Sequence, residues 1–176
     1  MKRSISIWQL AGFLVTALGG TFLHFLYDIS GGATWAALIS GVNESTWEHM
    51  KLLFFPMFVF VIVQSFFFRD IDSFWCVKLR GILLGLVLIP LIFYTYNGVI
   101  GESPDTVNIA IFFVSAAAAY LYESRLFKGN GIRCVFPWLA FAVLCAIALI
   151  FFVFTFAPPQ LAIFEDPITG TFGIRG

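Results

Sequence analysis

The sequence predicts an all-α integral membrane protein: a five-helix transmembrane bundle with a short interfacial or re-entrant helix and a folded-back C-terminal tail. The first supporting observation is composition, because 60% of the 176 residues are hydrophobic, only 11% are charged and the mean hydropathy is +0.95. An ordinary soluble domain has about 25% charged residues, and it could not bury 23 Phe and 5 Trp. The second observation is that the apolar residues gather in five stretches, each close to the roughly 20 residues that cross a bilayer.

The five stretches are about 7–27, 49–68, 79–97, 106–122 and 134–157. They are too long and too continuously apolar for barrel strands, and only helices satisfy the backbone of such segments in lipid. The connections between them are short, so we expect residues 1–176 to form a single transmembrane domain. The first stretch follows Lys2 and Arg3, as in a secretory signal, but no clean cleavage site closes it and we interpret it as a retained helix.

Two further segments are predicted to lie against the membrane without crossing it. Residues 30–43 are too short to span and too apolar for water, which indicates an interfacial or re-entrant helix anchored by Trp35. Pro158 and Pro159 end the last helix. The apolar residues that follow, such as Phe164, favour a tail at 158–176 that folds back on the bundle.

Small residues predict where helices pack closely. Gly81 and Gly85 form a G-x-x-x-G motif in the third stretch, and 116–119 is a run of Ala in the fourth. A five-helix bundle must itself pack, which favours contacts within one chain over a dimer interface.

Basic residues are distributed unevenly between the two sides of the predicted bundle. With the N-terminus inside, eight Lys or Arg residues fall on the cytoplasmic side and two, Lys51 and Arg175, fall on the other. Since cytoplasmic loops carry an excess of Lys and Arg, we expect a cytoplasmic N-terminus and a C-terminus outside. Cys76 and Cys134 would then face a reducing compartment, so no disulfide is expected.

The formal net charge of zero conceals two opposite excesses. The cytoplasmic side would carry eight basic and three acidic residues (+5), and the outer side two basic and seven acidic residues (−5). Acidic residues contribute little to orientation, so the outer acids need another explanation. These acids are Asp28, Glu44, Glu48, Glu102, Asp105, Glu165 and Asp166.

Both histidines of the chain fall on the same side as these acids. His24 and Asp28 are four residues apart, as are Glu44 and Glu48, and each spacing predicts a shared helix face; His49 follows Glu48 directly. Imidazole and carboxylate ligands together suit zinc or a similar divalent ion, which makes His24, Asp28 and His49 the predicted metal ligands. Glu44 and Glu48 are the predicted catalytic carboxylates, one of them as a general base on water.

A structural interpretation of the same residues stays open. Ser45-x-x-Glu48 matches a capping box at a helix start, and Glu48 with Lys51 has the spacing of a simple ion pair. His24 and Asp28 could form a hydrogen bond that fixes the end of the first helix. No H-E-x-x-H or comparable metal-binding spacing is present.

Three classes of function are compatible with this pattern. The first is a metal-binding protein or a metal-dependent, membrane-embedded hydrolase that acts on a lipid-like or exported substrate. The second is a small transporter or channel with a proton or cation site, in which Pro56 and Pro90 kink their helices. The third is a non-enzymatic accessory protein. No phosphate loop, nucleophile elbow or nucleic-acid-binding surface is recognisable, so we expect contact with membrane lipid and none with nucleic acid.

Two motifs carry a resemblance to a known family. The first is GVNESTWEH at 41–49, followed by KLLFFP at 51–56, and the second is DPITGTFGI at 166–174, which follows FTF at 154–156 and the proline pair. They resemble the signature and closing motifs of a family of small bacterial multi-pass membrane proteins of unknown function. The resemblance covers essentially the whole chain. It implies a bacterial plasma membrane and no particular activity, because none is known for the family.

Overall fold

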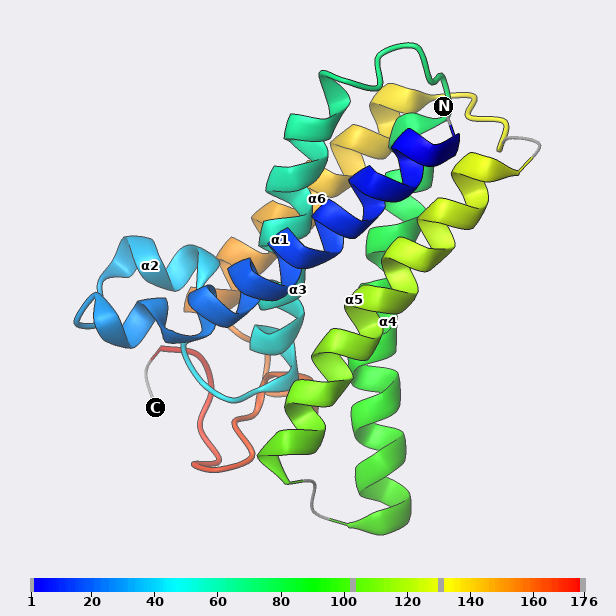
Figure 1. The fold of residues 1–176 in the computed structure, drawn as a ribbon. Coiled ribbons are helices and arrows are strands. Elements are labelled where there is room, and N and C mark those ends of the chain that lie inside the picture. The colour runs from blue at the N-terminus through cyan, green and yellow to red at the C-terminus, as the bar shows by residue number, and fades with distance from the viewer. Residues whose placement is uncertain (1, 102–103, 130–131, 175–176) are drawn as a thin grey trace.

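The computed structural model is entirely helical apart from loops and one isolated bridge, and it describes residues 2–101, 104–129 and 132–174. Among these residues, five helices are long and apolar enough to cross a membrane, so the chain is a multi-pass helical membrane protein (Figure 1). The long helices are α1 (Lys2–Ile29), α3 (Thr46–Ser65), α4 (Phe74–Ile100), α5 (Asp105–Lys128) and α6 (Pro137–Phe156). The shorter elements are α2 (Thr34–Ile39) and the 3₁₀ helix η1 (Ala162–Phe164).

Each apolar stretch of the sequence lies largely within one long helix, and local residues explain where the helices begin and end. α3 begins three residues before the stretch at 49–68 because the Ser45 hydroxyl accepts a hydrogen bond from the Glu48 backbone N–H, which caps the helix. α6 begins with Pro137 in its first turn, where the missing N–H costs nothing. α4 ends at Gly101, whose φ of 101° favours glycine.

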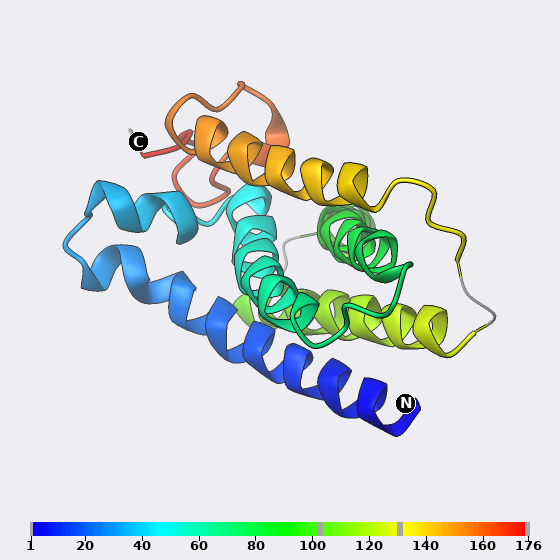
Figure 2. The same ribbon diagram turned by 90° about the horizontal axis from the view of Figure 1, so that it is seen from above.

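The helices form an up-and-down bundle with two distinct ends (Figure 1). The amino-terminal end carries the start of α1 and the loop 66–73, and the tail end carries α2 and residues 157–174. The end-on view shows α3 and α4 between the outer helices (Figure 2). α3 contacts all four other spanning helices and is the most buried of the five.

The short helix and the tail both fold against the tail end of the bundle. α2 contacts α1, α3 and α6, and its Ala36 and Ala37 are fully buried. The tail places Phe164 in a buried position, with its ring centroid 4.6 Å from that of Trp47. The folded-back tail is therefore a packed part of the structure.

Glycines on α1 and α4 allow the spanning helices to approach closely. A Cβ at Gly81 would lie 2.3 Å from the Glu123 side chain of α5, and a Cβ at Gly85 would lie 3.4 Å from Ala119 of the same helix. The G-x-x-x-G motif of α4 thus packs against α5 within the chain. On α1, Gly12 lies against Tyr120 and Gly20 against Phe112, so α1 and α5 also meet through glycine.

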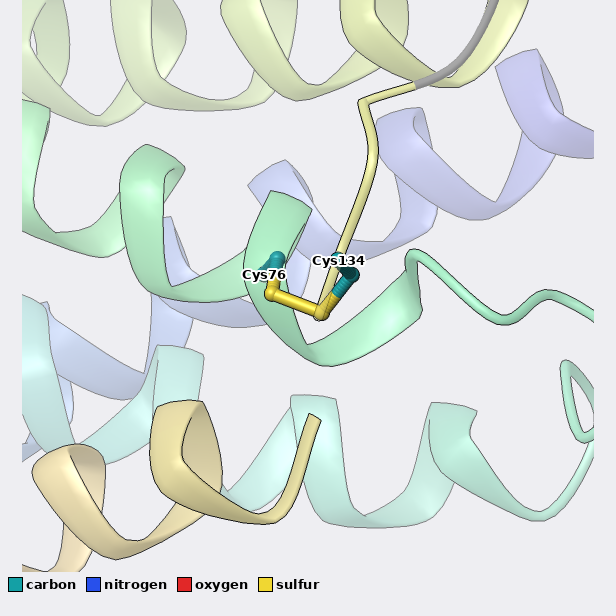
Figure 3. Close-up of a disulfide and its surroundings, with 2 residues drawn as sticks. All are labelled: Cys76 and Cys134. Carbon is teal, nitrogen blue, oxygen red and sulfur yellow. A yellow bond between two sulfur atoms is a disulfide. The ribbon is translucent and has the colours of Figure 1, made fainter. Parts of the chain in front are cut away.

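The structure corrects the expectation that the chain has no disulfide. Cys76, in the first turn of α4, is bonded to Cys134 in the segment before α6, and their Cα atoms are 5.8 Å apart (Figure 3). The pairing arises because α4 and α6 pack side by side, which brings together two residues 58 positions apart. Cys145, within α6, is free.

Candidate functional site

The two histidines meet around one glutamate at the tail end of the bundle. One carboxylate oxygen of Glu44 lies 3.7 Å from His24 Nε2, and the other lies 3.6 Å from His49 Nε2. The two imidazole centroids are 5.9 Å apart. The three side chains are 33%, 41% and 20% exposed for His24, Glu44 and His49, so the cluster is half-buried and open to small solutes.

Three different elements supply these side chains. His24 comes from the last turns of α1, His49 from the first turn of α3, and Glu44 from the loop before α3. The predicted helical stripe of Glu44 and Glu48 is therefore wrong, because the helix begins only at Thr46. The Asn43 side-chain oxygen accepts a hydrogen bond from the Ser45 N–H, which holds the loop in a tight turn beside the cap.

The geometry of the cluster fits a divalent metal. One possible ligand atom from each of His24, Glu44 and His49 lies within 4.8 Å of the other two. Two ligand atoms on a tetrahedral zinc ion are about 3.4 Å apart, close to the observed His–Glu distances. His49 Nδ1 lies 3.0 Å from the Ser45 carbonyl oxygen, so a proton on Nδ1 is donated to that oxygen and Nε2 remains free to bind an ion. Each Glu44 oxygen faces an imidazole nitrogen, so a metal ion held between them would be in reach of all three side chains.

Two cavities adjoin the cluster. The larger, about 470 Å³, lies between α1 and α5, and its floor is formed by α3. The smaller, about 20 Å³, is lined by Glu44, Thr46, His49 and Asn108 together with four apolar side chains. A cavity of that size with several polar partners can hold one water molecule. The cluster thus borders both the larger groove and a space large enough for one water molecule.

Glu48, the second predicted catalytic carboxylate, lies in a different environment. It is 2% exposed, and its Oε2 accepts hydrogen bonds from Lys51 Nζ and from the Val42 backbone N–H. Lys51 is fully buried and also donates to the Ala37 carbonyl oxygen of α2 and the Thr155 hydroxyl of α6. The Glu48–Lys51 pair therefore links α2, α3 and α6. It is the ion pair that the structural interpretation of the sequence predicts.

The other predicted acids lie apart from the cluster or outside the described residues. Asp28 is exposed near the end of α1, and Glu165 is exposed in the tail. Asp166 is buried, and its side chain accepts a hydrogen bond from the Ile168 N–H. Glu102, the side chain of Asp105 and Arg175 lie outside the described part of the structure. Within that part, His24, Glu44 and His49 are the group that could hold an ion.

Sequence reasoning missed a second buried ion pair at the opposite end. Lys78 of α4 and Glu123 of α5 are both fully buried, with Nζ and Oε2 2.6 Å apart. The aromatic rings of Phe74, Tyr120 and Phe127 lie within 6 Å of the ammonium group. Both residues flank apolar stretches in the sequence, where they look like loop charges. The extension of α4 and α5 beyond those stretches is what buries them.

Comparison with known proteins identifies the family but no activity. The family model of DUF6512, described as a family of unknown function, matches residues 1–174. No curated protein and no solved structure matches the chain. The match covers nearly the entire chain and agrees with its all-helical, multi-pass architecture. The chain therefore belongs to the DUF6512 family, a family of unknown function.

Proposed function

We propose that this protein is a membrane-embedded, metal-dependent hydrolase whose metal site consists of His24, Glu44 and His49. The observation that carries the proposal is the convergence of these three ligand groups next to a cavity of about 20 Å³. Two histidines and one glutamate, with a fourth position left for water, form a ligand set used by hydrolytic zinc enzymes. Asp28, the other ligand predicted from the sequence, is not part of this group.

The chemistry follows from the roles of the three side chains. A divalent ion supplies Lewis acidity, which makes water a stronger nucleophile at neutral pH. His24, His49 and one Glu44 oxygen would hold the ion, and the second Glu44 oxygen would accept the proton of the attacking water. For an ester, the water oxygen bonds to the carbonyl carbon, the ester C–O bond breaks, and the proton passes from Glu44 to the departing alkoxide. The products are an acid and an alcohol.

Zinc titration of the purified, chelator-treated protein in detergent micelles tests the metal site directly. We expect one zinc ion per chain by calorimetry and elemental analysis. His24→Ala, His49→Ala and Glu44→Gln should each weaken zinc binding by at least about 10–100-fold. Replacing a residue that only hydrogen-bonds to a metal ligand already causes a loss of this size. Hydrolysis of a long-chain p-nitrophenyl ester should disappear in Glu44→Gln and on chelation.

The matched control is Glu165→Gln, which removes an exposed carboxylate of the tail outside the cluster. It should bind zinc and hydrolyse the ester as the unmodified protein does. Thermal unfolding of every variant separates loss of the site from loss of the fold. Folded protein without stoichiometric zinc, or full zinc affinity in Glu44→Gln, would remove the basis of the proposal.

A transporter is less well supported by the arrangement of polar groups. Between Lys51 and Gln64, every buried residue of the central helix α3 is apolar. The two buried ion pairs lie at opposite ends of the bundle. Between them, α3 provides no continuous row of polar side chains along which a proton or cation could pass. A hydrolytic site that opens at one end requires no such path.

We further propose that the protein lies in a bacterial plasma membrane with its N-terminus in the cytoplasm. The distribution of Lys and Arg, eight against two, supports this orientation. The cluster of His24, Glu44 and His49 would then lie at the outer face.

A further inference from the structure

The lining of the groove beside the cluster changes from mostly polar near the tail end to mostly apolar deeper in the bundle. Its polar residues are His24, Glu44, His49, Asn108 and Thr21, and its apolar residues are Gly20, Phe25, Leu52, Ile109, Phe112, Phe113 and Ile168. Most of the polar groups lie nearer the tail end. α1 runs toward that end, so Gly20 is deeper than His24, whereas α3 and α5 run away from it, so Leu52 and Phe112 are deeper than His49 and Asn108.

The groove opens sideways between α1 and α5. The two helices are in contact at Gly20, where a Cβ would lie 2.4 Å from the Phe112 ring, and they diverge toward the tail end (Figure 1). Phe25 on α1 and Ile109 on α5, which both line the groove, are 53% and 57% exposed. In a membrane, such exposed apolar side chains face lipid, so the opening admits molecules from the bilayer.

From this geometry we infer that the substrate is a membrane lipid, bound with one acyl chain in the α1–α5 groove and its ester or phosphate group at the His24–Glu44–His49 cluster. The inference rests on the proposed function for the reaction, but the groove binds the chain independently of the metal. A volume of about 470 Å³ lies within the range of ligand pockets. An apolar chain gains no hydrophobic energy by moving from lipid to the groove, so recognition comes from van der Waals contact and from the polar end.

The experiment uses a long-chain lysophosphatidylcholine that carries a photoreactive diazirine at the end of its acyl chain. The purified protein is reconstituted in phosphatidylcholine vesicles with this probe, irradiated and mapped by peptide mass spectrometry. We expect labelling of peptides that contain Gly20, Phe112 or Phe113, the deep part of the groove. A probe with the diazirine next to the glycerol should instead label around His24 and Asn108.

Two tryptophan substitutions on α5 provide the critical comparison. Ile109→Trp fills the groove at its rim, whereas Val114→Trp adds the same ring to a residue that is 55% exposed and outside the groove. Ile109→Trp should reduce deep labelling by about tenfold, because the added ring takes the place of the chain and removes its van der Waals contacts with the groove; tenfold corresponds to about 1.4 kcal/mol. Val114→Trp should leave it unchanged.

The outcomes for the groove and for the metal site can be told apart. Deep labelling that survives removal of metal by a chelator supports the groove, even if zinc binding and hydrolysis both fail. Labelling spread evenly along the lipid-facing helices, or unaffected by Ile109→Trp, would overturn the inference, even if zinc binds stoichiometrically. Loss of deep labelling in both tryptophan variants would also overturn it, because the effect would then not depend on the groove.

Discussion

Two glutamates four residues apart, Glu44 and Glu48, lie in different environments at the start of α3. Glu44 is 41% exposed and lies between two imidazoles, whereas Glu48 is 2% exposed and neutralises Lys51. The difference arises from position relative to the helix cap. Glu44 precedes Ser45 and points from a loop, while Glu48 follows it and lies on the face of α3 that packs against α2 and α6. A catalytic role fits the exposed residue and a structural role the buried one.

The buried Lys78–Glu123 pair permits a sharp test of stability. Glu123→Leu leaves the Lys78 ammonium fully buried without its counter-ion, which should lower the free energy of unfolding by about 3–5 kcal/mol. Unfolding in micelles, followed by circular dichroism, measures the loss. The double variant Lys78→Met with Glu123→Leu should lose much less, because no charge then remains buried. Equal losses in the single and double variants would contradict this role.

At this scale the sequence predicts the candidate site only in part. The convergence of His24 and His49 follows from topology, since both fall near helix ends on the same side of the bundle. The choice among Asp28, Glu44 and Glu48 does not, because it depends on side-chain burial and on where the Ser45 cap begins α3. Periodicity assumes a continuous helix through Glu44, and the cap overrides it.

Among the elements, α4 shows how one helix uses glycine in two different ways. Gly81 faces Glu123 across the interface with α5, whereas Gly98 has no atom within 4 Å of the position of a Cβ. Gly81→Ala should therefore be destabilising, because the Glu123 side chain that it displaces is tied to Lys78. Gly98→Ala should be neutral or stabilising by up to about 1 kcal/mol, since Ala is the better helix former.

Thermal unfolding of the two alanine variants in the same detergent measures this contrast. Both substitutions add one methyl group to the same helix, so a difference in Tm between them reports the different surroundings of the two positions. A similar shift in Tm for both would show that the α4–α5 interface tolerates an added methyl group, contrary to the packing described above.

The elements that do not span the membrane were harder to predict in detail than those that do. Hydropathy and the prolines at 158–159 are sufficient to predict a helix end and a tail that returns to the bundle. They do not reveal that Phe164 packs on Trp47 or that the Asn43 side chain donates to the Gly173 carbonyl oxygen. These contacts join segments far apart in sequence, and the local pattern contains no signal for them.

For the molecule as a whole, five spanning helices follow from the lengths and spacing of the apolar stretches, whereas the disulfide does not. Apolar stretches of bilayer length permit few other structures in lipid, which makes the helices predictable. The pairing of Cys76 with Cys134 instead depends on α4 and α6 lying side by side. The expectation of free thiols rested on the redox state of the predicted compartment. It contained no information about the distance between Cys76 and Cys134.

Orientation and thiol state can be tested together in cells. The disulfide and the basic residues favour opposite orientations, because disulfides persist in oxidising compartments whereas Lys and Arg are enriched in cytoplasmic loops. With the proposed cytoplasmic amino-terminal end, the reducing compartment would keep Cys76 and Cys134 as thiols in cells, although they lie close enough to bond. In a Cys145→Ser background, a membrane-permeant maleimide should label both thiols in intact cells and an impermeant one neither. A disulfide preserved in cells alkylated before lysis, with impermeant labelling after reduction, would reverse the proposed orientation.

The central position of α3 has a consequence for how the protein enters the membrane. α3 leaves the ribosome before α4, α5 and α6, yet it carries a buried glutamate and a buried lysine. Lys51 bonds to Glu48, one turn away, and to the Ala37 carbonyl oxygen, both of which have been synthesised when α3 inserts. Its remaining partner, Thr155, arrives only with the last helix. Two of the three partners of Lys51 are therefore available before the last helix is made, and these local contacts would reduce the cost of placing the lysine in the membrane before α6 completes the packing.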